Sequence, residues 1–152
     1  PTLIFAGTGP DKSLVELACQ KYEHVHYVGF INSTEEMARW HASSDIAFAL
    51  SSGETFGLSI VESLASGVPL IAVRDGAAQE HAERSQAGAI ITPYSVEELA
   101  DALIPLIIMK DRSSLQRNAR SYAEGLSWSN CFEKQIHWYK KVAHPKAPDE
   151  TI

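Results

Sequence analysis

The sequence predicts an α/β domain with a Rossmann-like, mostly parallel sheet and helices on both faces. Short apolar runs of strand length alternate with segments of helical periodicity from the start of the chain to about residue 110. The apolar runs are continuous rather than alternating, which is typical of strands that helices cover on both faces. The strand–helix alternation favours parallel pairing, because parallel strands need a crossover connection.

Five runs rich in Val, Ile, Leu, Ala and Phe are expected as strands. They cover residues 2–7, 24–30, 45–50, 69–74 and 88–92. Helices are expected from Asp11, with Leu14, Leu17 and Ala18 on its apolar face, and near 58–66 and 77–85. Two further helices begin at capping boxes, in which a Glu follows a Ser by three residues: Ser33 with Glu36, and Ser95 with Glu98.

After residue 112 only helical patterns remain, so a helical C-terminal extension is expected, with Trp128, Trp138 and Tyr139 as packing residues. Residues 1–143 are interpreted as one domain, which suits a chain of 152 residues. Residues 144–152 contain two prolines and no apolar stripe, and are expected to form a flexible tail.

Composition excludes several classes of protein. The net charge is −6 and the 13 Lys and Arg residues are scattered, which argues against nucleic-acid binding. No apolar run approaches the roughly 18 residues that a membrane span needs. Cys19 and Cys131 are expected as free thiols, and a cytoplasmic setting is expected. His24 and His26 lack a third ligand nearby, so no metal site is expected.

The stretch SSGETFGLSIVESLASGVPLIA, residues 51–72, holds the candidate site. Its first part follows a strand, where ligands bind in open parallel sheets. Gly53 and Gly57 allow the backbone to approach a ligand closely. The amides of Phe56, Gly57 and Leu58 open the next helix, and the helix dipole favours a phosphate there.

Two carboxylates flank this turn. Helical periodicity places Glu62 at the border between the apolar and the polar face, about one turn into the helix. From there Glu62 can accept hydrogen bonds from two adjacent hydroxyls, such as those of a ribose, while Glu54 reaches the group beyond the phosphates. Spacing alone leaves open the alternative that both carboxylates are merely solvated.

The same stretch resembles the donor-binding segment of glycosyltransferases with the GT-B fold, particularly glycosyltransferase family 4. That pattern is Glu-x7-Glu enclosing Phe-Gly-Leu, followed by Ala-x-Gly-x-Pro and a buried strand. The matching residues are Glu54, Phe56, Gly57, Leu58, Glu62, Ala65, Gly67 and Pro69. The resemblance extends over residues 2–110, including LIFAGTGP and VHYVGFIN.

The resemblance implies a nucleotide-sugar donor site with a UDP-, GDP- or ADP-sugar as substrate. It implies that Glu62 holds the ribose and that Glu54, the catalytic candidate, holds the transferred sugar. The remaining donor-binding candidates are Gly7, Gly9, Ile31, Thr55, Phe56, Gly57 and Leu58, with Ile31 against the base. Family members transfer the sugar with retention and need no cofactor or metal.

The resemblance also implies that the family's first strand and helix, with an Arg and a Lys for the diphosphate, precede residue 1. That strand is central in the doubly wound order, between residues 2–7 and 45–50. We therefore expect an unusual repair, such as direct pairing of these two strands or a strand supplied by another copy. We also expect an absent N-terminal acceptor domain and an inactive isolated chain; the intact enzyme's peripheral association with a membrane stays open.

Two alternatives remain. The chain resembles other GT-B enzymes as well, such as a nucleotide-sugar epimerase, which moves no sugar to an acceptor. It also suits a non-catalytic subunit that completes a partner's active site. The sequence fixes neither the sugar, the base nor the acceptor.

Overall fold

The computed structural model describes residues 1–143, so the expected tail at 144–152 lies outside the described residues. The strands and helices alternate as predicted, and each expected strand is present, though shorter at its ends. The elements are β1 (Leu3–Ala6), α1 (Lys12–Lys21), β2 (Val25–Gly29), α2 (Thr34–Ala42), β3 (Ala47–Ala49), α3 (Leu58–Ala65), β4 (Leu70–Val73), α4 (Ala77–Ser85), β5 (Gly88–Ile91), α5 (Val96–Ile108), α6 (Ser113–Glu124) and α7 (Trp128–Ala143).

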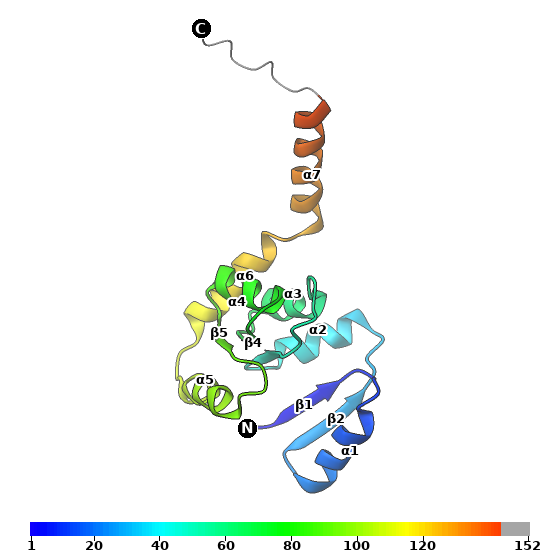
Figure 1. The fold of residues 1–152 in the computed structure, drawn as a ribbon, viewed down its shortest axis with the longest axis vertical. Coiled ribbons are helices and arrows are strands. Elements are labelled where there is room, and N and C mark those ends of the chain that lie inside the picture. The colour runs from blue at the N-terminus through cyan, green and yellow to red at the C-terminus, as the bar shows by residue number, and fades with distance from the viewer. Residues whose placement is uncertain (144–152) are drawn as a thin grey trace.

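The strands form two parallel sheets instead of the single sheet predicted. One has the order β3-β4-β5 and the other is the pair β1-β2. In the larger sheet Ala47 pairs with Leu70, and Leu70 pairs with Gly88. All four residues of β4 are buried, as expected for a strand with neighbours on both sides. Figure 1 shows β1, β2 and α1 as a unit set apart from β4 and β5.

The predicted direct pairing of β1 with β3 is wrong for the described strands, which belong to separate sheets. A slot of about 510 Å³ separates them, lined by Leu3–Ala6 on one side and Ala47–Ala49 on the other. Met37 and Trp40 of α2 also line it. β1 and β3 therefore each keep one backbone edge that pairs with no other strand of residues 1–143.

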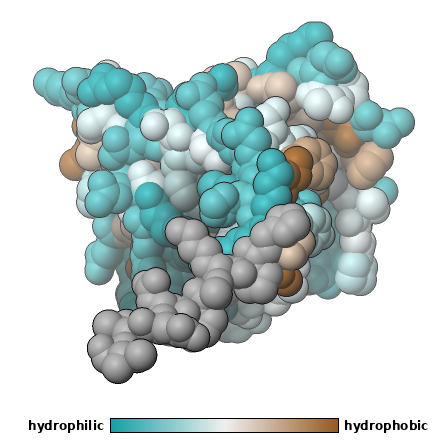
Figure 2. Space-filling view, turned by 90° about the horizontal axis from the view of Figure 1, so that it is seen from above, coloured by the Kyte–Doolittle hydropathy of each residue, from teal (hydrophilic) through white to brown (hydrophobic). Residues whose placement is uncertain are grey.

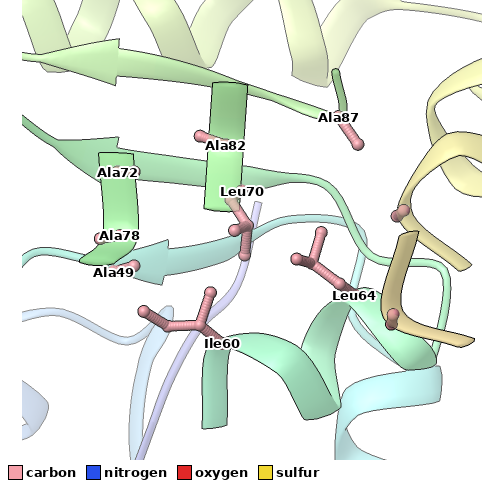
Figure 3. Packing of buried hydrophobic residues seen from close by; sticks show 10 residues of the cluster. Ala49, Ile60, Leu64, Leu70, Ala72, Ala78, Ala82 and Ala87 are labelled. Atoms are coloured by element: carbon pink, nitrogen blue, oxygen red, sulfur yellow. The ribbon is translucent and has the colours of Figure 1, made fainter. Parts of the chain in front are cut away.

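The core lies on both faces of β3-β4-β5. On one face α3, α4 and α6 supply Ile60, Leu64, Ala82 and Ala119 to a cluster around Leu70. Figure 3 shows Ile60 and Leu64 of α3 reaching toward β3 and β4. On the other face Leu106 and further residues of α5 pack against Ile71, Val73 and Ile91. The predicted two-faced arrangement of helices is therefore confirmed for this sheet.

Both predicted helix starts are confirmed. Ser33 Oγ accepts a hydrogen bond from the Glu36 amide, and Ser95 Oγ accepts one from the Glu98 amide, each over 3.2 Å. The glutamates do not complete a reciprocal box. Instead, Glu98 accepts a hydrogen bond from the Thr92 amide over 2.7 Å, which ties the end of β5 to α5.

The terminal helix does not pack as predicted. α7 extends away from the rest of the domain (Figure 1), and Trp128, Trp138 and Tyr139 are exposed. Seen end-on in Figure 2, the surface is mostly hydrophilic with separate apolar patches. Both cysteines are free, as predicted. Within residues 1–143, no helix combines the length and the apolarity needed to cross a bilayer.

The core packing of α3 predicts a large cost for Leu64→Ala. Leu64 is fully buried, so the change removes apolar contacts and leaves a cavity, and we expect the free energy of unfolding to fall by about 2–5 kcal/mol. Leu14→Ala is the matched control, because Leu14 is 62% exposed although the sequence placed it on a packed face. Its effect is expected to stay within about 0.5 kcal/mol. Urea unfolding of both variants measures this, and equal losses would contradict the described core.

The slot predicts uneven amide hydrogen exchange. The Ala47 amide donates to the Pro69 carbonyl, so by the alternation of a parallel ladder the Phe48 amide faces the slot. We expect Phe48 to exchange much faster than Ile71, which lies in the central strand. Mass-spectrometric or NMR exchange measures this at two protein concentrations. Equal protection of Phe48 and Ile71 at the lower concentration would show that β3 has a second partner strand.

Candidate functional site

The turn before α3 is closed by Gly57 and Glu54. Gly57 has φ +76, in the left-handed region, and a Cβ there would lie 2.5 Å from Ile60 Cδ1, so the position requires glycine. The Gly57 amide donates to Glu54 Oε1 over 3.1 Å. A carboxylate is stabilised there by the positive end of the helix dipole. Of the three amides predicted for the phosphate side, the Gly57 amide is therefore occupied by Glu54.

The other two amides of the turn differ. Within residues 1–143, no hydrogen bond is formed by the backbone amide of Phe56 or Leu58. Thr55, Phe56 and Leu58 are exposed at the helix start, whereas Gly57 between them is buried. Two free donors at a helix N-terminus can donate hydrogen bonds to an anionic group of a ligand.

A buried histidine holds this turn from behind. His81 of α4 is 4% exposed, and its Nε2 lies 2.6 Å from the Phe56 carbonyl oxygen. Because a carbonyl only accepts, Nε2 carries the hydrogen, and Nδ1 accepts from the Tyr122 hydroxyl over 2.9 Å. Burial raises the pKa of Tyr122, which keeps that hydroxyl protonated. The turn is thus fixed to α4 and α6.

The pattern of residues 77–85 predicts a helix but gives His81 no role. A signal was present in the spacing. Ala78, His81, Ala82 and Ser85 are the buried residues of α4 and follow the i, i+3, i+4, i+7 pattern of a packed face. A histidine on such a face needs polar partners.

Glu62 and Ile31 line one groove. The groove has a volume of about 450 Å³ and lies between the β2–α2 loop, α2 and α3, with Arg120 of α6 at its edge. Ile31 lies two residues after the end of β2 and is buried. The Glu62 side chain is 57% exposed and lies beside α2, because Ile60 and Leu64 direct the other face of α3 into the core. The structure therefore brings together two residues that are 31 positions apart.

Gly7 and Gly9, the predicted donor-binding glycines of the first loop, do not line this groove. Gly7 follows β1 with φ +121, and its amide donates to the Gly29 carbonyl over 2.8 Å. The Tyr27 hydroxyl donates to the Gly7 carbonyl over 2.8 Å. These bonds hold the loop to β2. Neither Gly7 nor Gly9 lines the Ile31–Glu62 groove.

A second histidine, His41 of α2, lines the same groove. Its Nδ1 lies 3.0 Å from Ser63 Oγ and its Nε2 lies 3.9 Å from Glu62 Oε2. Burial lowers the pKa of His41, and the Glu62 carboxylate opposes this shift. The imidazole is therefore neutral at pH 7, with a single ring hydrogen. No motif in the sequence singles out His41.

Comparison with known proteins identifies the family. The family model described as "Glycosyl transferases group 1" matches residues 1–124. A relative from Mycobacterium tuberculosis, GDP-mannose-dependent alpha-(1-6)-phosphatidylinositol monomannoside mannosyltransferase, is 34% identical over 122 residues. The match covers 73% of this chain and 31% of the relative. The chain thus spans about a third of the length of that relative.

Solved structures agree with this result. HepE from Anabaena in complex with UDP-glucose is 25% identical, with a TM-score of 0.74 over 93% of this chain and 41% of that protein. The C-terminal domain of a glycosyl transferase group 1 family protein from Francisella tularensis is 27% identical, with a TM-score of 0.65 over 77% of this chain and 64% of that domain. The fold is that of the C-terminal domain of a GT-B glycosyltransferase, and the chain belongs to the glycosyl transferases group 1 family.

Proposed function

We propose that the chain is the donor-binding domain of a retaining glycosyltransferase of family 4 type, which transfers a hexosyl group from a nucleotide-diphosphate sugar. The acceptor would be held by an N-terminal domain, and the isolated chain would bind the donor without transferring it. The observation that carries this proposal is the shared groove of Ile31 and Glu62 beside the start of α3.

Each part of a nucleotide has a suitable partner along this path. A base would lie against the apolar side chain of Ile31. The ribose hydroxyls would donate to Glu62, since a carboxylate only accepts and can take two hydroxyls at once. Leu58, the first residue of α3, precedes Glu62 by four residues, or about 6 Å along the helix. A diphosphate joined to that ribose would reach the free amides of Phe56 and Leu58.

Glu54 is proposed as the catalytic residue, acting on the sugar side. Its carboxylate already lies at the helix start, where it accepts from the Gly57 amide. Its second oxygen would accept hydrogen bonds from hydroxyls of the transferred sugar. These bonds would fix the position of the anomeric carbon relative to the diphosphate. Charge on the leaving diphosphate would be stabilised by the helix start and its amides, so the proposed reaction requires no metal.

The identity of the nucleotide follows from relatives only as a proposal. The mycobacterial relative is named as GDP-mannose-dependent, and HepE is described in complex with UDP-glucose. We propose a UDP- or GDP-hexose as the donor of this chain. An ADP-sugar is the third candidate, and competition among the three nucleotides in a binding assay ranks them.

Glu62→Ala is expected to weaken binding of UDP or GDP to the chain by roughly ten- to a hundredfold, because about 1.5–3 kcal/mol of charged hydrogen bonding to the ribose is lost. Titration calorimetry measures the change, and Glu97→Ala, an exposed carboxylate on α5, is the control. The 2′-deoxynucleotide tests the same contact from the side of the ligand. It should bind the wild type less tightly than the ribonucleotide does, whereas Glu62→Ala should bind the two nucleotides with equal affinity. An unchanged affinity in Glu62→Ala would remove the ribose role.

Glu54→Gln is expected to weaken binding of the sugar part of the donor and to leave binding of the nucleotide part unchanged. The amide side chain still accepts from the Gly57 amide but loses the charge that strengthens hydrogen bonds to sugar hydroxyls. We expect affinity for the nucleotide sugar to fall by about tenfold, or 1.4 kcal/mol, and affinity for the nucleoside diphosphate to stay the same. Parallel titrations with both ligands measure this. A loss that is equal for both ligands would contradict the sugar-side role.

A further inference from the structure

The His41 ring lies between two groups of α3: a hydroxyl, which can donate or accept a hydrogen bond, and a carboxylate, which only accepts. Its Nδ1 contacts the Ser63 hydroxyl oxygen over 3.0 Å, and its Nε2 faces a Glu62 carboxylate oxygen at 3.9 Å. The Nε2 atom is buried and has no hydrogen-bond partner within the described residues. The Glu62 side chain is largely exposed, so a small rotation can bring its carboxylate onto Nε2.

The position of one hydroxyl hydrogen decides which ring nitrogen is protonated. Ser63 Oγ lies 2.9 Å from the Ser59 carbonyl and also contacts His41 Nδ1, but it has only one hydrogen. If that hydrogen points to Ser59, Nδ1 must carry the ring hydrogen, and the bare Nε2 lone pair faces the Glu62 carboxylate. If it points to Nδ1, Nε2 carries the hydrogen and directs it at Glu62.

The second arrangement is the favourable one. It replaces the repulsion between the lone pair of the buried Nε2 and the carboxylate with an attractive contact. Little is lost at Ser59, whose carbonyl can accept the amide hydrogen of the residue four positions later in the helix. The other charged group along the groove, Arg120, is already engaged by Glu124 and the Ala65 carbonyl.

We propose that His41 is a positioning residue for the nucleotide site, whose Nε2–H holds the Glu62 carboxylate on the groove side of α3, in line with Ile31. Each carboxylate oxygen has two lone pairs, so Glu62 can accept a hydrogen bond from His41 and still accept hydrogen bonds from the ribose hydroxyls. This inference rests on the proposed function, because the value of a fixed Glu62 lies in binding a ribose. It adds a residue from α2 that does not touch the ligand.

Two substitutions separate positioning from packing. The side-chain nitrogen of Gln reaches the place of Nε2, so His41→Gln can still donate to Glu62. Asn extends only as far as Nδ1, so His41→Asn keeps a polar contact with Ser63 but does not reach Glu62. We expect His41→Gln to bind UDP or GDP within about twofold of wild type and His41→Asn to bind about five- to tenfold less tightly.

The double variant His41→Asn/Glu62→Ala should bind no more weakly than Glu62→Ala alone, since residues that act as a unit are not additive. Thermal unfolding of each variant checks that the ordering does not follow stability. Asn binding like wild type, or losses that add in the double variant, would overturn the inference.

A ligand-free measurement keeps this inference distinct from the proposed function. Long-range 1H–15N spectra of the 152-residue chain report which ring nitrogen of His41 is protonated. We expect the hydrogen on Nε2, and Glu62→Gln should lower the pKa of His41 further by removing the opposing charge. A hydrogen on Nδ1, or an unchanged pKa, would overturn the inference even if nucleotides bind. The expected tautomer in a chain that binds no nucleoside diphosphate would instead contradict the proposed function, and the positioning role with it.

Discussion

The burial of β4 between β3 and β5 is the constraint on which the candidate site depends. β4 is enclosed by a strand on each edge and by helices on each face. This fixes the strand ends from which the turn before α3 and the turn before α4 emerge. α3 is then held by Ile60 and Leu64, which leaves Glu62 on the side that faces α2. The carboxylate is placed by core packing on the opposite face of its own helix.

Hydrogen bonds from two histidines add to the core packing that positions the candidate site. His81 connects the carbonyl of Phe56 to Tyr122, so the turn that carries the free amides is tied to two helices of the core. His41 connects α2 to α3 at the groove itself. Both histidines are hydrogen-bonding links, and both contact residues assigned to the ligand. The site therefore combines an exposed set of acceptors and donors with a supporting set that orients them.

The sequence was sufficient for the order of the elements and for both helix caps, because these depend on local periodicity and spacing. It was insufficient for the sheet, since whether residues 2–7 and 45–50 pair depends on tertiary packing that local periodicity does not encode. The apolar face of α1 and the aromatic residues of α7 were expected to pack, yet Leu14 and Trp128 are exposed. Periodicity identifies an apolar face and does not show what covers it.

The same limit applies to the site. Ile31 and Glu62 were nominated separately, and only the fold brings them into one groove. His41 and His81 carry no motif and gain a role only from neighbours distant in sequence. The hydrogen bond from the Gly57 amide to the Glu54 carboxylate depends on the side-chain torsions of Glu54, which the spacing of residues does not determine. Candidate residues that belong to a sequence motif could thus be nominated from the sequence, whereas the histidines that contact them could not.

The most direct test of the donor site is an NMR titration of the 15N-labelled chain with UDP and with GDP. The account predicts that amide shifts gather at residues 31–34, 56–58 and 62, which lie along the groove and the start of α3. Shifts confined to the slot between β1 and β3, or no shifts at millimolar nucleotide, would contradict it.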